Sequence, residues 1–142
     1  MYKDILLPVD LGNPETQEKA VSTAIEMAKV FGSRLHVMTI VPDFGESFVS
    51  SFFPVDYQEK AVEAANTTLH AFVKEHIPEG IQVQHIVAHG TIYDEILSFA
   101  KEHQIDMIVM ASHRPQLQDY LLGPNASHVV RHSNCSVTVV RN

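Results

Sequence analysis

The sequence predicts an α/β fold, a three-layer sandwich with helices on both faces of a five-stranded parallel sheet. Apolar segments of strand length alternate along the chain with amphipathic helical segments, the pattern of repeated right-handed β-α-β crossovers. The first segment, "KDILLPVD", is apolar without alternation, as in a strand buried on both faces. With 142 residues, the chain has the length of one domain, 1–142.

The first half of the chain supplies two strands and one helix. The first strand ends at Asp10. Over residues 15–31, apolar side chains recur every three or four positions, which predicts a helix packed on the sheet, and Gly32 is a natural helix stop. "RLHVMTIV" is the second strand, and Pro42 is expected to break it.

An aromatic-rich segment, 43–57, has no clear period and is interpreted as a long loop. Loops of this length in compact domains are usually functional or disordered, and its phenylalanines could instead form an interface patch. The next helix, from 58 to about 76, has one apolar face and ends before Pro78 and Gly80.

The second half completes the sheet. "IQVQHIVAHG" alternates like a strand, and Thr91 with Asp94 resembles a capping box that opens a third helix through Ala100. "IDMIVMA" is the fourth strand. A short helix around 126–132 then precedes the last strand, "SVTVV".

Composition excludes several classes of partner. The formal net charge is -7, which argues against nucleic acid, because that binding needs clustered Lys and Arg. No apolar run reaches the length of a membrane span, and the first residues resemble a strand more than a signal peptide. Cys135 is the only cysteine, so no intramolecular disulfide is possible and a cytoplasmic location is expected.

Two strand ends predict a ligand site. In an open parallel sheet, ligands bind outside the carboxyl ends of strands, where the strand order reverses. The first strand ends at Pro8, Val9 and Asp10, which supplies a carboxylate. The fourth strand ends at Met110, Ala111 and Ser112, where small residues allow a ligand to approach the backbone closely.

The loop before the last helix predicts an anion site. Gly123, Pro124 and Asn125 precede a helix whose first N–H groups and dipole attract an anion, and His113 and Arg114 add cationic donors. A carboxylate at one end and anion donors at the other suit a nucleotide. Pro124 could instead be only the first residue of a helix, where proline is common.

Other chemistries find less support. The turn "VDLGNPETQ" has neither a Walker A nor a G-x-G-x-x-G pattern, and no late Lys accompanies a phospho-accepting Asp as in a receiver domain. Ser112, His113 and Asp10 lack the nucleophile elbow of a hydrolase triad. His128 and His132 lie four apart, but a third metal ligand is missing, so a solvent-facing pair is expected.

"ILLPVD", "LHVMTIVP" and "MIVMASHRP…YLLGPNASHVVRHSNCSVTVV" together resemble the universal stress protein family over essentially the whole chain. "ASHRP" with the closing segment is similar to the F/G-type branch of small bacterial members. The resemblance implies the strand order 3-2-1-4-5, a homodimer through the last strand and, in nucleotide-binding members, ATP in the cleft.

The resemblance also assigns parts of the cleft. Pro8, Val9, Asp10 and Ile40 would lie at adenine and ribose. The residues 110–114 would form the first phosphate loop, and Gly123, Pro124 and Asn125 the second.

The chain departs from the family motif at three positions. Ala111 and Arg114 replace glycines, and Pro124 replaces a Ser or Thr, which removes a hydroxyl and a backbone N–H from the phosphate loop. Losing two such donors costs about 2–5 kcal/mol unless Arg114 or Asn125 compensates.

The predicted function is that of a cytosolic stress-response sensor or adaptor that binds ATP, with Mg²⁺ as the metal that would accompany it. Hydrolysis is expected to be slow at most, because no general base is evident. The alternative is a dimeric interaction module whose cleft no longer binds nucleotide. The expected assembly is a homodimer through the last strand, with a tetramer of two dimers as the larger form considered.

Overall fold

The computed structural model describes residues 1–42, 57–112 and 123–141. Five parallel strands form one sheet in the order β3-β2-β1-β4-β5, which confirms the predicted fold class and strand order. The strands are β1 (Asp4–Pro8), β2 (Arg34–Pro42), β3 (Val83–Gly90), β4 (Met107–Ala111) and β5 (Ser136–Val140).

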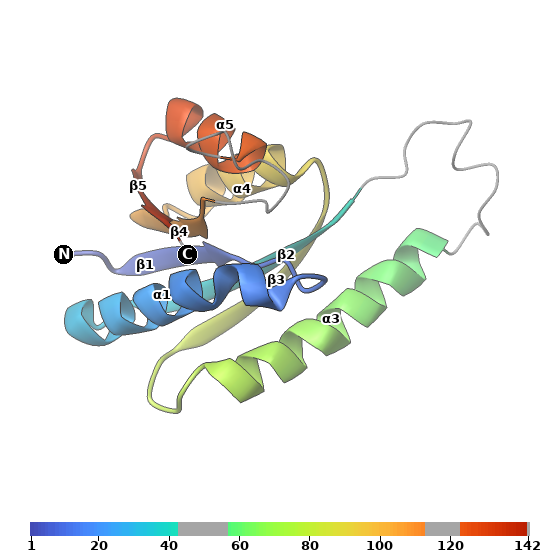
Figure 1. The fold of residues 1–142 in the computed structure, drawn as a ribbon, viewed down its shortest axis with the longest axis horizontal. Coiled ribbons are helices and arrows are strands. Elements are labelled where there is room, and N and C mark those ends of the chain that lie inside the picture. The colour runs from blue at the N-terminus through green and yellow to red at the C-terminus, as the bar shows by residue number, and fades with distance from the viewer. Residues whose placement is uncertain (43–56, 113–122, 142) are drawn as a thin grey trace.

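Helices cover both faces of this sheet (Figure 1). α1 and α3 lie on one face, and α4 and α5 lie on the other. The described helices are η1 (Pro14–Gln17), α1 (Glu18–Phe31), α3 (Tyr57–His76), α4 (Ile92–Glu102) and α5 (Pro124–His132).

The central strand β1 is buried on both sides, which explains its uninterrupted apolar sequence. Leu7 packs into the cluster that contains Leu69 of α3. Leu6, its neighbour, faces the opposite cluster with Ile96 of α4 and Val129 of α5. All five side chains are fully buried. Because successive residues of a strand point to opposite faces, one apolar strand anchors both helical layers.

The first helix differs from its prediction at its start. Residues 14–17 form the 3-10 helix η1, and α1 begins only at Glu18. Pro14 occupies the first position of η1, which fits its fixed φ. The predicted stop at Gly32 is confirmed: this residue adopts a left-handed φ of 64° and donates its N–H to Ala28 O.

Other boundaries correct the sequence prediction. Pro42 does not break β2 before its end but is its last residue, paired with Gly90 of β3 and four residues beyond Met38, the last residue of β2 that pairs with β1. Thr91 is the N-cap of α4, but its side chain makes no capping hydrogen bond, so the predicted capping box is wrong. α5 begins at Pro124 rather than near 126. The predicted long loop lies almost wholly outside the described residues.

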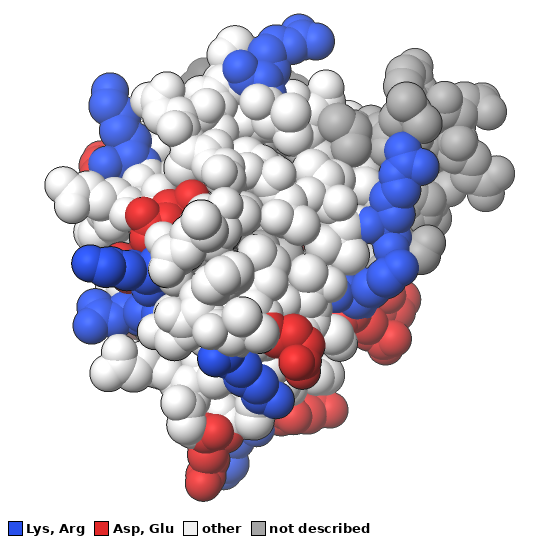
Figure 2. Space-filling view, turned by 90° about the vertical axis from the view of Figure 1, so that its left-hand side faces the viewer, with Lys and Arg blue, Asp and Glu red and all other residues white. Residues whose placement is uncertain are grey.

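Charged side chains of both signs are spread over the face of the molecule where β1 begins (Figure 2). Figure 2 shows the side of the molecule where β1 begins, with Lys and Arg mainly toward the margin, Asp and Glu among them and an uncharged centre. Within the described ranges, no helix is long and apolar enough to cross a membrane.

Candidate functional site

A cavity of about 360 Å³ opens where β1, β2 and β4 end and where α4 and α5 begin. This is the position expected for a ligand site in an open parallel sheet. The structure brings together every described residue that the sequence predicted for the site: Pro8, Val9, Asp10, Ile40, Met110, Ala111, Ser112, Gly123, Pro124 and Asn125. His113 and Arg114 lie outside the described residues.

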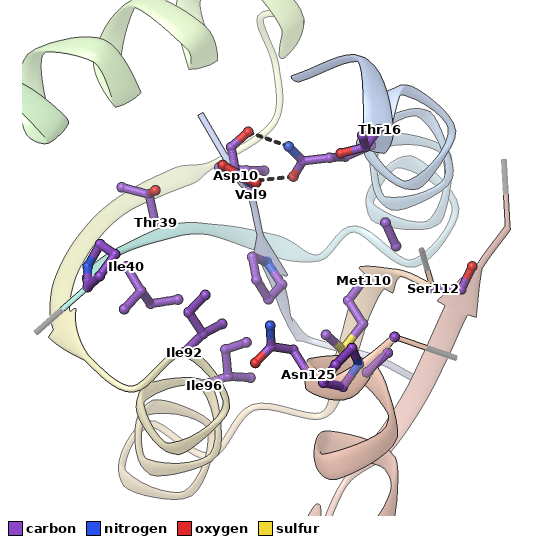
Figure 3. A pocket seen from close by; sticks show the side chains of 17 residues that line it. Val9, Asp10, Thr16, Thr39, Ile40, Ile92, Ile96, Met110, Ser112 and Asn125 are labelled. Atoms are coloured by element: carbon purple, nitrogen blue, oxygen red, sulfur yellow. Dashed lines mark hydrogen bonds between the residues drawn. The ribbon is translucent and has the colours of Figure 1, made fainter. Parts of the chain in front are cut away.

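The cavity is also lined by seven residues that the sequence did not indicate as site residues. They come from the turn after β1, from the end of β2 and from the first turns of α4 and α5, and they are Thr16, Gln17, Thr39, Pro42, Ile92, Ile96 and Ala126. The helical spacing of Ile92 and Ile96 was assigned to the core. Only the placement of α4, which begins at the carboxyl ends of the strands, turns these two side chains toward the cavity (Figure 3).

The turn after β1 is held by one buried glutamine. The Asp10 N–H donates to Gln17 Oε1 at 2.7 Å, and Gln17 Nε2 donates to Asp10 O at 2.5 Å and to Asn13 O at 3.2 Å. Both donors of the Gln17 amide are therefore used, and its side chain is buried although it borders the cavity. Gln17 fixes the backbone of Asp10 through both of its polar groups.

The Asp10 carboxylate is fixed by the same turn. Asp10 Oδ1 accepts the Gly12 N–H at 3.0 Å, and Asp10 Oδ2 accepts Asn13 Nδ2 at 3.1 Å. Asp10 is exposed, and a carboxylate has about four acceptor sites. Two acceptor sites are thus left for a ligand, and sugar hydroxyls are donors of the right kind.

An apolar wall faces this carboxylate. Ile40 at the end of β2 and Ile92 and Ile96 of α4 lie together on one side of the cavity, and Met110 of β4 lies farther along (Figure 3). Ile96 and Met110 are buried, whereas Ile40 and Ile92 are half-buried. Side chains of this kind provide a flat apolar surface against which an aromatic base can pack.

The end of the cavity near α5 is built from backbone. The Ser112 N–H donates to Val140 O at 2.9 Å, and the Gly123 N–H donates to Ser112 O at 2.6 Å. The amide of Gly123, which the resemblance places in the second phosphate loop, is therefore already paired. Pro124 has no N–H, so the first turn of α5 offers the N–H groups of Asn125 and Ala126, which cannot be satisfied within the helix.

Metal ligands are scarce near the cavity. Asp10 is the only carboxylate among the described residues that line it, and the described ranges contain no group of three His, Cys, Asp or Glu that could hold a metal ion. The predicted histidine pair on α5 makes tilted ring contacts: the ring centroids of His128 and His132 lie 4.4 Å apart, and those of His128 and Tyr93 lie 3.8 Å apart.

Comparison with known proteins identifies the fold and the family together. The model of the universal stress protein family matches residues 1–141. Universal stress protein G of Escherichia coli O157:H7 is 33% identical over 145 aligned positions, which cover 99% of this chain and 100% of the relative.

Solved structures agree. The structure of universal stress protein MJ0577 from Methanocaldococcus jannaschii superimposes with a TM-score of 0.83 at 28% identity, covering 100% of this chain and 97% of that chain. The universal stress protein from Archaeoglobus fulgidus in complex with dAMP has a TM-score of 0.61 at 20% identity, with 97% of each chain covered. The chain belongs to the universal stress protein family.

Proposed function

We propose that this universal stress protein binds an adenine nucleotide, with ATP as the expected ligand, and acts as a stress-response sensor or adaptor. One observation carries the proposal: a single cavity joins a fixed carboxylate, an apolar wall and the beginning of a helix. A related fold in complex with dAMP adds support from outside the chain.

The nucleoside half fits the residues present. The base would pack against Ile40, Ile92 and Ile96, and the ribose hydroxyls would donate to Asp10. Gln17 holds the backbone of Asp10, and Gly12 and Asn13 hold its carboxylate. Binding would therefore cost little entropy for ordering this side chain.

The phosphates would extend toward α5. The N–H groups of Asn125 and Ala126 and the helix dipole favour negative charge there, and His113 and Arg114 stay the expected cationic donors. No described carboxylate is placed to hold Mg²⁺ near this end, so phosphate oxygens and water would supply the ligands of Mg²⁺ bound with ATP.

Hydrolysis would be slow at most. Asp10 is the only acidic or basic side chain among the described lining residues, and it lies at the nucleoside end. A general base must reach the attacking water within hydrogen-bond distance, which Asp10 does not do when it binds the ribose. The proposed role is therefore nucleotide-dependent signalling rather than turnover.

The expected assembly is a cytoplasmic homodimer formed through β5, with pairing of dimers into a tetramer as a further possibility. β5 is an edge strand of the sheet, and Val130 of the neighbouring α5 is 45% exposed. An unpaired edge strand next to apolar surface is a natural site for a second copy. Light scattering after gel filtration tests this assembly.

Thermal unfolding of the nucleotide-stripped protein tests the nucleotide proposal. Adenosine, AMP, ADP and ATP are compared with and without Mg²⁺, and GTP serves as the control ligand. At 100 times the dissociation constant, a ligand stabilises the native state by about 2.7 kcal/mol, which shifts the melting temperature by several degrees. We expect a shift with all four adenine ligands and a smaller one with GTP.

The alternative function is a dimeric interaction module without nucleotide. Pro124 and the paired Gly123 amide favour it, because they leave the phosphate end with few donors. If none of the four adenine ligands shifts the melting temperature of the folded, stripped protein, nucleotide binding is excluded and the interaction module stands.

A further inference from the structure

Buried polar side chains divide into two groups in this protein. Among the described residues, five with polar side chains are buried: Gln17, Ser33, His36, Thr39 and Ser112. Three of them are fully paired. Gln17 holds the β1 turn, the Ser33 hydroxyl donates to Tyr2 O, and both ring nitrogens of His36 face oxygens, at 2.7 and 2.9 Å.

The other two have no partner in the part of the chain that the structure describes. Neither the Thr39 nor the Ser112 hydroxyl makes a hydrogen bond to any described residue. The two residues as a whole are only 6% and 5% exposed, but neither hydroxyl oxygen is among the fully buried unpaired atoms, so each oxygen is open to solvent. Both line the same cavity. A hydroxyl that no described protein group satisfies and that is open to solvent has its hydrogen bonds available to a ligand. Here the shared feature is a cavity that a ligand can enter.

The two hydroxyls lie at different ends of that cavity. Figure 3 shows Thr39 between Asp10 and Ile40, and Ser112 on the other side of the view, beyond Met110 of β4. Neighbouring residues of a strand point to opposite faces, so Thr39 and Ile40 line different sides of the cavity. Ser112 belongs to the predicted phosphate loop, whereas Thr39 belongs to no predicted part of the site.

We propose that Thr39 is a specificity-determining residue whose hydroxyl forms a hydrogen bond with the nucleoside half of the bound nucleotide. This inference rests on the proposed nucleotide site and adds a contact to it. A hydroxyl both donates and accepts, so it can pair with a base edge or with a sugar hydroxyl next to Asp10. Its distance from the Ser112 end places it away from the phosphates.

The proposal predicts opposite behaviour for binding and for stability. A hydroxyl that is unpaired in the free protein contributes nothing to folding through a hydrogen bond, so replacing it by a methyl group of similar shape should not destabilise the free chain. The same replacement should weaken the bound state, because the ligand loses its partner. A purely structural threonine would show the reverse.

Isothermal titration of the full, nucleotide-stripped chain with adenosine, AMP and ATP tests the proposal. Thr39→Val removes the hydroxyl, and Thr39→Ser keeps it. We expect Thr39→Val to weaken all three ligands by the same factor, about three- to tenfold, the size of one net hydrogen bond, and Thr39→Ser to stay within about twofold of the unaltered protein.

Ser33→Ala is the matched control, since it removes a buried hydroxyl that is paired and lies outside the cavity. It should lower the melting temperature of the free protein by about 3 °C and leave the three affinities unchanged. Thr39→Val should leave the melting temperature within about 2 °C of the unaltered protein or raise it.

Three results would overturn the inference while leaving the nucleotide site intact. They are unchanged affinities in Thr39→Val, a loss confined to ATP, and a fall in melting temperature as large as that of Ser33→Ala. If the unaltered protein binds none of the three ligands, the proposed function and this inference fall together.

Discussion

The two ends of the cavity are built in different ways. At the β1 end, side chains hold the turn: Gln17 binds the backbone of Asp10, and Gly12 and Asn13 bind its carboxylate. At the α5 end, the described contacts join backbone to backbone, from β5 to Ser112 and from Ser112 to Gly123. The nucleoside end is therefore organised before a ligand binds, and the phosphate end has few donors left to offer.

This difference suggests that the two ends of the cavity contribute unequally to nucleotide affinity. A fixed carboxylate beside an apolar wall gives affinity at low entropic cost. A helix start without a capping side chain and with Pro124 in place of an N–H donor gives a weaker grip on phosphate. The protein should then bind adenine ligands mainly through the nucleoside, with modest gains for each added phosphate.

Replacing Gln17, which holds the turn at the β1 end, should have the largest effect. Gln17→Leu leaves the N–H and O of Asp10 and the O of Asn13 without their partner. Because Asp10 and Asn13 are exposed residues whose freed groups can regain water, we expect the free energy of unfolding to fall by about 2–3 kcal/mol. Urea denaturation measures this change.

Gln82→Leu is the control for that variant, because Gln82 is exposed and its replacement should change the free energy of unfolding by less than about 0.5 kcal/mol. If Gln17→Leu behaves like Gln82→Leu, the turn after β1 is held by something other than this amide, and the contrast between the two ends disappears.

Removing the carboxylate should have the second largest effect. Asp10→Ala is expected to weaken adenosine and ATP by the same factor, about tenfold or more, because hydrogen bonds to a charged group contribute about 1.5–3 kcal/mol. Titration calorimetry with both ligands measures it, and Glu63→Ala on the exposed face of α3 is the charge-matched control. A loss for ATP alone would place the carboxylate at the phosphates instead.

Restoring a donor at the α5 end should have a smaller effect of opposite sign. Pro124→Ser returns an N–H and a hydroxyl to the first turn of α5, so ATP should bind about threefold to tenfold more tightly while adenosine is unchanged. Comparing the two ligands in the same variant separates phosphate contacts from a general change of shape. Equal gains for both would contradict the assignment of this end to phosphate.

The fold could be predicted because its signals are local. Uninterrupted apolar strands, helical periodicity and Gly32 at a helix end each reflect the conformation of a short segment. Asp10 and Ser112 were found in the same way, since each follows a strand. Gln17 was missed because only the 3-10 turn η1 brings its side chain back to Asp10. Thr39 was missed because a threonine inside a strand gives no sign that its hydroxyl lacks a partner.

The smallest expected effect lies outside the cavity, on the α3–β3 side of the sheet. The rings of His70 and His85 stack with centroids 3.9 Å apart. Burial, and then the charge of His70, lower the pKa of His85 below its ordinary value of 6.5. The unfolded chain keeps the ordinary pKa and so binds more protons between the two values. Stability is therefore complete above that window and falls as the pH drops through it.

His70→Gln removes one of the two causes, so this variant should lose less stability than the unaltered protein between pH 7.5 and pH 5.5. The difference should be about 1 °C in melting temperature, because both rings are partly exposed to solvent. His89→Gln, an exposed position on the same strand, should not reproduce it. Since no histidine is among the described lining residues, adenosine affinity should change equally with pH in all three proteins. A change specific to His70→Gln would mean that the α3–β3 side is coupled to the cavity.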